Sequence, residues 1–224
     1  MNINKILKSW KYPFILLAGI GISNVGAWVY LLALNLIVFE QTGSPLAVAG
    51  LYILIPLATI VTNFWSGSLI DRLNKRSLMV VLDLFRALCI FSLPWVLDAS
   101  IWLLYMIVFL INMATSMFNP TSMSYITRLI PAEQRKRFNS LRSLMDSGAF
   151  LIGPAIAGVL FMMGDPVLAI LINAGALFLS GIITLLMPNL EKQTSSIGRE
   201  EWSWRLIRSD FNTVMAFSVI MCTS

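Results

Sequence analysis

Charged side chains are rare in this sequence, so the places where they gather mark where chemistry is possible. Four of them fall within six residues, just after Gly67 and between two long apolar runs: Asp71, Arg72, Lys75 and Arg76. We expect Asp71 to face a cation or the N-terminus of another helix, because a negative charge is unfavourable near the C-terminal end of its own helix. Lys75 and Arg76 are explained more simply, as basic residues that fix membrane topology and contact anionic lipids.

A second acid and a second base lie inside an apolar run. Asp83 and Arg86 are three residues apart, so they can pair on one face of a helix. Ionisable groups within a membrane span are candidates for function by default. Two interpretations stay open. One is a structural ion pair within a turn or two of the membrane surface, linked to Arg72, and the other is a carboxylate that takes part in proton coupling.

Side-chain amides and small residues mark further helix faces. Asn24 and Trp28 share one face of the first apolar run, and Asn112 lies in the fourth. Buried amides need hydrogen-bond partners or water, so these faces point either at a cavity or at each other. In the fifth run small residues permit close helix packing and a proline bends the helix. They are Gly148, Ala149, Gly153, Pro154, Ala157 and Gly158.

The composition argues against several other kinds of site. The chain has no histidine, and its two cysteines, Cys89 and Cys222, both lie in apolar runs, so neither a zinc site nor a disulfide framework is predicted. The acids are scattered and neither cysteine has an activating neighbour, so we predict no enzyme, no cofactor and no metal. The net charge of +5 does not indicate nucleic acid, because the basic residues fall in short loops between apolar runs.

Membrane-spanning helices must position all of these residues. The 224 residues are 58% hydrophobic and only 12% charged, with a mean hydropathy of +0.80. The fold class is therefore all-α, a polytopic transmembrane helix bundle with six spans and a partial seventh. The predicted spans are residues 12–39, 46–70, 77–97, 101–125, 147–163 and 167–187, with the partial span at 211–224. Residues 128–142 are predicted to be the most charged loop.

The spans divide the chain into three parts. Residues 1–190 form a six-span unit, and residues 191–210 form a linker with a short amphipathic helix. Residues 211–224 are too few to cross a bilayer, so we predict that the chain stops within a seventh span. The basic residues lie at the N-terminus, in alternate loops, after the sixth span, or at Arg86. This asymmetry places the N-terminus and the basic loops in the cytoplasm.

The charged stretch resembles a known motif. Gly67-x-x-x-Asp71-Arg72-x-x-Lys75-Arg76, after the second span, resembles motif A of the major facilitator superfamily in spacing and position. This resemblance covers one six-helix half of a superfamily whose members normally have two halves.

Other segments of the chain are similar to particular members of the same superfamily. Gly148 with Gly153-Pro154-x-x-Ala157-Gly158 is similar to motif C, which is associated with exporters. It departs from that motif at Ala157, where a glycine often sits, and Gly148 lies one residue further upstream. Asp83-Leu-Phe-Arg86-Ala and Phe118-Asn-Pro120 are similar to the macrolide-efflux and siderophore-exporter branch.

The resemblance implies a transporter in the bacterial inner membrane that exports small amphipathic molecules by alternating access and is coupled to protons. Each half would contain two three-helix inverted repeats. Asp71 and Arg72 would help latch the two halves together on the cytoplasmic side. Spans one and four would line the central cavity, so Asn24, Trp28 and Asn112 are candidates for substrate contact, with interhelical hydrogen bonding as the alternative.

The same resemblance makes the expected partners a small-molecule substrate, the lipid bilayer, and a missing C-terminal half or a second copy of the chain. The small-residue ridge of the fifth span would contact that second half, or else pack within this one. Two further possibilities stay open: the chain is a truncated fragment that does not transport, or it acts as a homodimer of halves.

Overall fold

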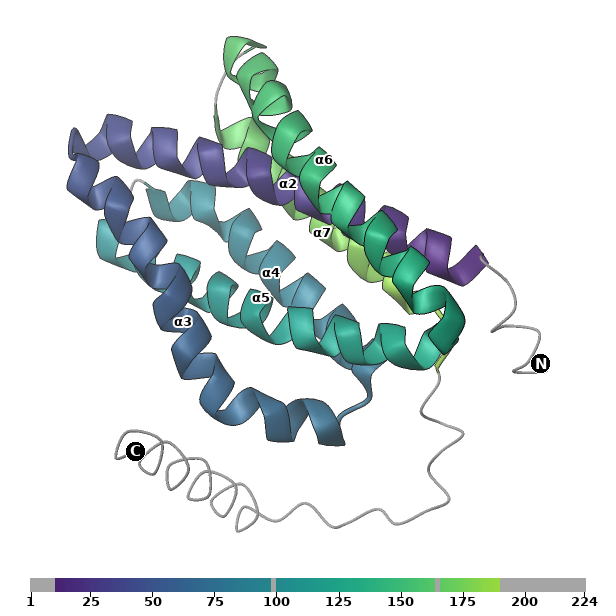
Figure 1. Ribbon diagram of the computed structural model, residues 1–224. Helices are drawn as coiled ribbons and strands as arrows, with labels where there is room; N and C mark the ends of the chain where they lie inside the picture. The colour runs from purple at the N-terminus through teal and green to yellow at the C-terminus, as the bar shows by residue number, and fades with distance from the viewer. Residues whose placement is uncertain (1–10, 98–99, 164–165, 190–224) are drawn as a thin grey trace, which may run out of the picture.

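The computed structural model describes residues 11–97, 100–163 and 166–189, and in this part the chain forms six helices (Figure 1). They are α2 (Lys11–Thr42), α3 (Pro45–Arg72), α4 (Lys75–Leu97), α5 (Ile101–Leu129), α6 (Ala132–Met163) and α7 (Val167–Leu185). All six are long and apolar enough to cross a membrane. The predicted all-α polytopic bundle is therefore confirmed, while the predicted linker and seventh span lie outside the described residues.

The charged region between the fourth and fifth spans differs from its prediction as a loop. α6 begins at Ala132, so most of residues 128–142 forms the first turns of that helix. Pro131 precedes the helix and its carbonyl accepts a hydrogen bond from the Gln134 amide at 3.0 Å. The segment that follows is rich in Glu, Gln, Arg and Lys, which favour helices, and Glu133 in the first turn complements the helix dipole. Charge alone had suggested a loop, but these residues extend the helix instead.

The helices pack as a row in the order α3, α5, α4, α7, α2 and α6, with a weaker contact between α2 and α3. Exchanging α2, α3 and α4 with α5, α6 and α7 converts the strongly packed pairs into one another. For example, α3 packs on α5 and its counterpart α6 packs on α2. This pattern is that expected of two three-helix repeats related by a pseudo-twofold axis.

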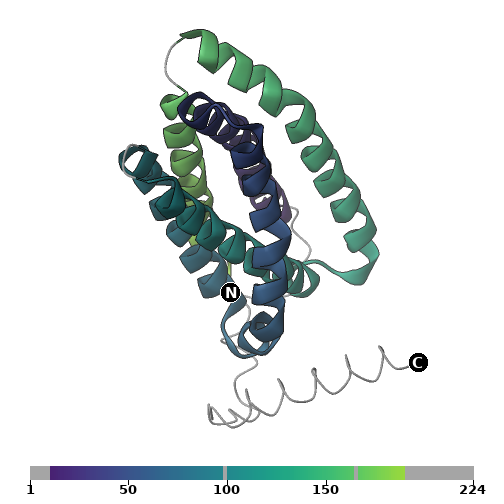
Figure 2. The same cartoon turned by 90° about the vertical axis from the view of Figure 1, so that its left-hand side faces the viewer.

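Burial varies strongly along the row. In α2, α4 and α7, 44% of the most apolar 18-residue window is buried, compared with 17% in α3 and α6. The view in Figure 2 shows α6 at the outside of the bundle. α3 and α6 therefore present most of their apolar surface to lipid or to another protein element.

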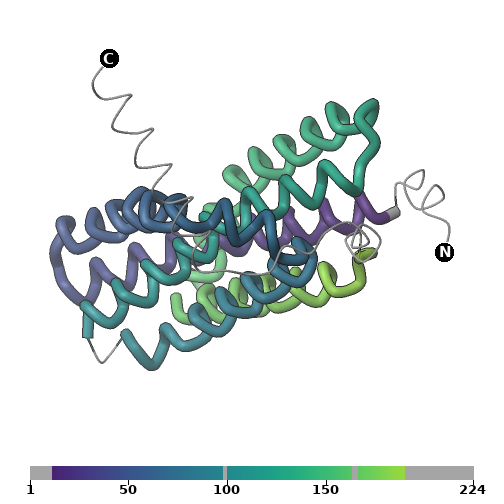
Figure 3. The backbone as a smooth tube through the Cα atoms, turned by 90° about the horizontal axis from the view of Figure 1, so that it is seen from below, coloured from purple at the N-terminus to yellow at the C-terminus, as the bar shows by residue number. Residues whose placement is uncertain are grey.

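The two ends of the bundle differ in charge. α2 begins and α7 ends at the same end, as Figure 3 shows. The short connections at residues 73–74 and 130–131 lie there too, because successive helices run in opposite directions. Arginine and lysine residues flank both connections, so we name this the basic end. The other end, with residues 43–44, is named the far end.

Candidate functional site

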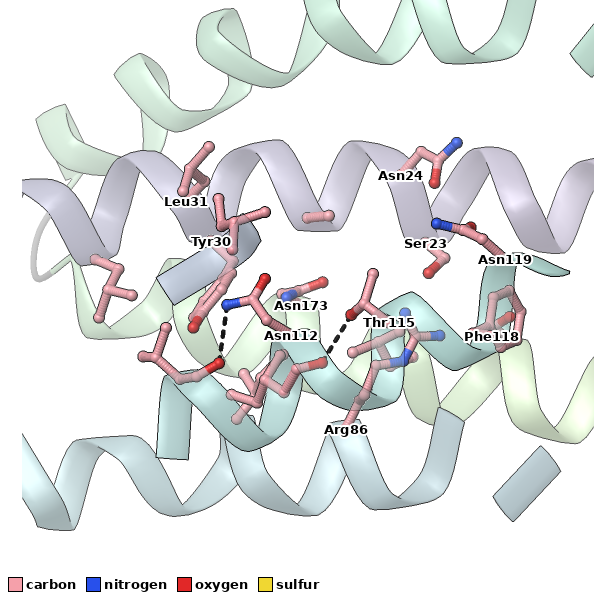
Figure 4. Close-up of a pocket in the computed structure, with 18 of the residues that line it drawn as sticks. Ser23, Asn24, Tyr30, Leu31, Arg86, Asn112, Thr115, Phe118, Asn119 and Asn173 are labelled. Atoms are coloured by element: carbon pink, nitrogen blue, oxygen red, sulfur yellow. Dashed lines mark hydrogen bonds between the residues drawn. The ribbon is translucent and has the colours of Figure 1, made fainter. Parts of the chain in front are cut away.

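A cavity of about 280 Å³ lies between the helices of the bundle (Figure 4). Its walls come mainly from α2, α3, α4, α5 and α7, and Arg142 of α6 also contributes. The polar residues that line it are Ser23, Asn24, Tyr30, Arg86, Asn112, Thr115, Asn119, Arg142, Asn173 and Ser180. The cavity therefore presents amides, hydroxyls and two guanidinium groups within an otherwise apolar wall.

Two of the three candidate substrate-contact residues line this cavity. Asn112 uses its amide nitrogen to donate to the Val108 carbonyl at 2.9 Å, so its amide oxygen stays available. Asn24 donates to the carboxylate of Asp146 at 2.5 Å, a bond that joins α2 to α6. The two amides come from α2 and α5, the first helices of the two repeats.

Trp28 has a different environment and is not among the residues that line the cavity. Its ring meets that of Phe150 edge to face, with centroids 5.0 Å apart and planes at 76°. A Cβ atom added at Gly153 would overlap the Cβ atom of Trp28, so the two helix backbones approach closely here. Trp28 therefore packs α2 against α6.

The intramembrane acid and base form the ion pair predicted from their spacing. Asp83 is fully buried and Arg86 is 7% exposed, and a guanidinium nitrogen of Arg86 pairs with one carboxylate oxygen. The hydroxyl of Ser180 donates to the other oxygen at 3.0 Å. The guanidinium carbon also lies 4.5 Å from the centroid of the Phe118 ring.

Asp83 lies eight residues after Lys75, the first residue of α4, and Arg86 lies one turn further along the helix. Arg86 lies eleven residues from each end of α4, which runs from Lys75 to Leu97. It therefore sits at the middle of the helix, and its guanidinium lines the cavity. A charge at this depth needs both its counter-ion and its contact with Phe118, because water is scarce there.

The charged stretch lies at the basic end and separates into two environments. Gly67 and Asp71 are exposed one turn apart on α3, and a Cβ atom at Gly67 would meet nothing within 4 Å. Within the described residues the Asp71 carboxylate has no hydrogen-bond or ion-pair partner. Arg72, the last residue of α3, is exposed beside it. No other described helix covers Gly67 and Asp71 on this face of α3.

Lys75 and Arg76, which topology alone had explained, make specific contacts. Lys75 is 3% exposed and its ammonium donates to the backbone carbonyl of Asp71 at 3.0 Å. Arg76 donates to the carbonyls of Thr184, at 3.4 Å, and Leu185, the last residues of α7. A cation at a helix C-terminus satisfies carbonyls that lack helical partners. Arg76 therefore fastens the end of α7 to the start of α4.

The small residues of α6 divide between two faces. Ala149 and Ala157 are 2% and 1% exposed, and Gly153 between them is buried against α2. The ridge predicted from these residues therefore packs within this six-helix unit. Gly148 and Gly158 differ, because a Cβ atom at either would meet nothing within 4 Å. Pro154 and Gly158 are exposed on the uncovered side of the helix.

Four residues that line the cavity were not predicted from the sequence: Tyr30, Arg142, Asn173 and Ser180. Asn173 offered a usable signal, since it is the only amide in its span and polar residues within spans are functional candidates. Arg142 was expected to lie in a loop, so it was not considered as a residue of the cavity. In the described part of the chain, no group of three or more potential metal-ligating acids, cysteines or histidines is present.

Comparison with known proteins identifies the family. The sequence pattern of the Major Facilitator Superfamily matches residues 8–224. The chain belongs to this superfamily. It is 31% identical over 184 residues to YfiS of Bacillus subtilis, an uncharacterized MFS-type transporter, covering 82% of this chain and 44% of that protein. It is 23% identical over 197 residues to macrolide efflux protein A of Streptococcus pyogenes, covering 84% of this chain and 48% of that protein.

The chain thus spans about half the length of these curated relatives. No solved structure matches it significantly. The family match, the relatives and the six apolar helices together make this a multi-pass membrane protein of the MFS transporter type.

Proposed function

We propose that this chain forms one half of an exporter that moves small amphipathic molecules out of a bacterial cell by alternating access. The observation that carries the proposal is the central cavity, where Asn24 and Asn112 from equivalent helices of the two repeats meet a mostly apolar wall. Apolar walls with a few placed polar groups suit small-molecule ligands. The efflux name of one relative supports the direction of transport.

A second half is proposed to cover the faces of α3 and α6, and to complete the cavity. These two helices are the least buried of the row, and Gly67, Gly148 and Gly158 leave space for close approach. The partner is either a second half of the same protein or a second copy of this chain. Mass measurement of the purified chain in detergent separates a dimer from a monomer that needs a different second half.

Asp71 and Arg72 are proposed to latch the two halves at the basic end, which faces the cytoplasm in this arrangement. The Asp71 carboxylate is exposed and has no partner among the described residues, which supports this role, because it can accept a cation or a helix N-terminus from the other half. The latch would hold the cytoplasmic side closed while the cavity is open to the outside. Lys75 and Arg76 would hold the charged stretch in position through their contacts with Asp71 and with the end of α7.

The test is efflux from cells that express the assembled transporter with Asp71→Asn, which removes the charge and keeps the shape. We expect efflux to fall at equal expression, while Asp71→Glu retains more activity because it keeps the carboxylate. Undiminished efflux by the Asp71→Asn protein would exclude the latch.

Proton coupling is proposed as the energy source, with Asp83, Asp146 or a residue of the second half as the coupling carboxylate. Efflux that persists without a proton gradient would exclude it.

A further inference from the structure

Three buried polar atoms in the wall of the cavity have no hydrogen-bond partner within the described residues. They are the Tyr30 hydroxyl, the Arg86 Nε and the Asn173 amide oxygen. These residues are 8%, 7% and 1% exposed, respectively. An unsatisfied buried polar group is costly, so three of them beside one cavity mark a place where a polar ligand would be stabilising.

The three atoms are not equivalent. The Asn173 oxygen lies against Gly26, since a Cβ atom there would come within 2.6 Å of it, so this oxygen faces the α2 backbone. Tyr30 and Arg86 are left, and both carry a hydrogen that they can donate. A ligand that accepts hydrogen bonds would therefore satisfy both the Tyr30 hydroxyl and the Arg86 Nε.

The charges around Arg86 favour an anion over a cation. Among the described residues that line the cavity there is no aspartate or glutamate, whereas Arg86 and Arg142 are both present. The carboxylate of Asp146 lies behind Asn24, which donates a hydrogen bond to it. Asp83 is fully buried, and Arg86 and Ser180 already occupy its two oxygens, so it is not open to a cationic ligand. A guanidinium binds carboxylates through parallel hydrogen bonds, and its attraction for an anion is strong at the middle of a membrane helix.

The apolar part of the cavity lies toward the far end. Leu34 of α2, Leu51 and Ile55 of α3, and Val108 of α5 line that part. Ser23, Asn24 and Asn119 lie toward the basic end, and Figure 4 shows them at the opposite side of the cavity from Leu31. A ligand that matches both parts has an acidic head and an apolar body.

We propose that the cavity binds amphipathic monoanions, with the acid group on Arg86 and the apolar body directed toward the far end. This proposal deepens the proposed function and rests on it for the idea that the bound molecule is transported. Asp83 holds the guanidinium in position, and Tyr30 donates to a further oxygen of the ligand where one is present. A membrane phospholipid does not supply the anion, because Arg86 lies at the centre of α4, far from the head groups.

The test uses the purified chain in nanodiscs of zwitterionic lipid and two probes with the same alkyl chain, dodecanoate and dodecyltrimethylammonium. Equilibrium dialysis against nanodiscs with and without protein gives binding corrected for partition into lipid. We expect dodecanoate to bind at least about tenfold more tightly than the cation. Equal binding of the two, tighter binding of the cation, or no specific binding of dodecanoate would overturn the proposal.

Two variants of the ion pair are expected to change the affinity for dodecanoate in different ways. Asp83→Asn keeps a side-chain oxygen that can accept from the guanidinium and removes the competing negative charge, so dodecanoate binding should hold or strengthen. The double variant Asp83→Asn/Arg86→Gln removes both charges together and leaves neither buried alone, and it should lose about tenfold in dodecanoate affinity. Lys136→Gln, an exposed position at the basic end, is the control and should change nothing. Undiminished dodecanoate binding by the folded double variant would exclude Arg86 as the anion site.

These measurements do not depend on transport. Dodecanoate binding without efflux in cells would leave the anion site standing and remove the proposed export function. If efflux requires Asp71 but the protein shows no preference for the anionic probe, the proposed export function would stand and the anion site would be excluded.

Discussion

The contact between Gly153 and Trp28 leads to a specific stability prediction. Replacing Gly153 with alanine would place a methyl group over the Trp28 Cβ atom, at 3.3 Å from Trp28 Cγ and 3.7 Å from its Cα. Carbon atoms prefer separations of about 3.5–4.0 Å. The Trp28 Cβ atom is fixed to the backbone and cannot rotate away, so α6 must move off α2.

The cost follows from these contacts. Overpacking a well-fitted interface costs about 1–3 kcal/mol. The displacement would also disturb the edge-to-face pair of Trp28 and Phe150, and such pairs contribute about 0.5–1.5 kcal/mol. We therefore expect Gly153→Ala to lower the free energy of unfolding by about 1–3 kcal/mol. Gly158→Ala, five residues further along α6, meets nothing within 4 Å and should be neutral or slightly stabilising.

Reversible unfolding of the purified chain in mixed micelles, followed by tryptophan fluorescence and circular dichroism, measures both variants. The two alanine variants are expected to differ in their free energy of unfolding. If both change the free energy of unfolding by the same amount, within about 0.5 kcal/mol, then Gly153 does not set the distance between α2 and α6.

Two further contacts can be tested by substitution. Asp83→Ala leaves Arg86 buried without its counter-ion, so it should cost about 3–5 kcal/mol of unfolding free energy, whereas the double variant Asp83→Ala/Arg86→Gln should cost clearly less. A double-mutant cycle in micelles that also includes Arg86→Gln measures the coupling, and additive losses would contradict the pair. Arg76→Gln removes a cation from the C-terminus of α7, so amide hydrogen exchange at residues 186–187 should become several-fold faster, while Lys136→Gln leaves it unchanged; equal exchange in both variants would show that Arg76 does not hold this end.

The sequence predicted the helices well because the apolar runs exceed the thickness of a membrane. The lengths of the apolar runs also located the spans along the chain. The predicted start of α6 was wrong, because a run of charged residues is as compatible with a helix beyond the membrane as with a loop. The spacing of Asp83 and Arg86 was enough to predict their ion pair, because residues three apart on a helix share a face.

The cavity was only partly predictable. Asn24 and Asn112 could be assigned to it, but Trp28, one turn beyond Asn24, faces α6 instead. Which side of a helix meets a neighbour depends on packing between distant parts of the chain, and a single polar stripe does not contain this information. The role of Arg76 was missed for the same reason, because its partners on α7 are more than a hundred residues away.

The central claim is that the cavity opens alternately to the two sides of the membrane. It is tested by cysteine labelling of Asn112→Cys in the assembled transporter, in a Cys89→Ser/Cys222→Ser background. A membrane-impermeant maleimide is applied to sealed vesicles of both orientations, with and without Asp71→Asn. The account predicts labelling from either side, and a shift toward the cytoplasmic side when the latch is removed. Labelling from one side only, at a ratio that Asp71→Asn does not change, would contradict it.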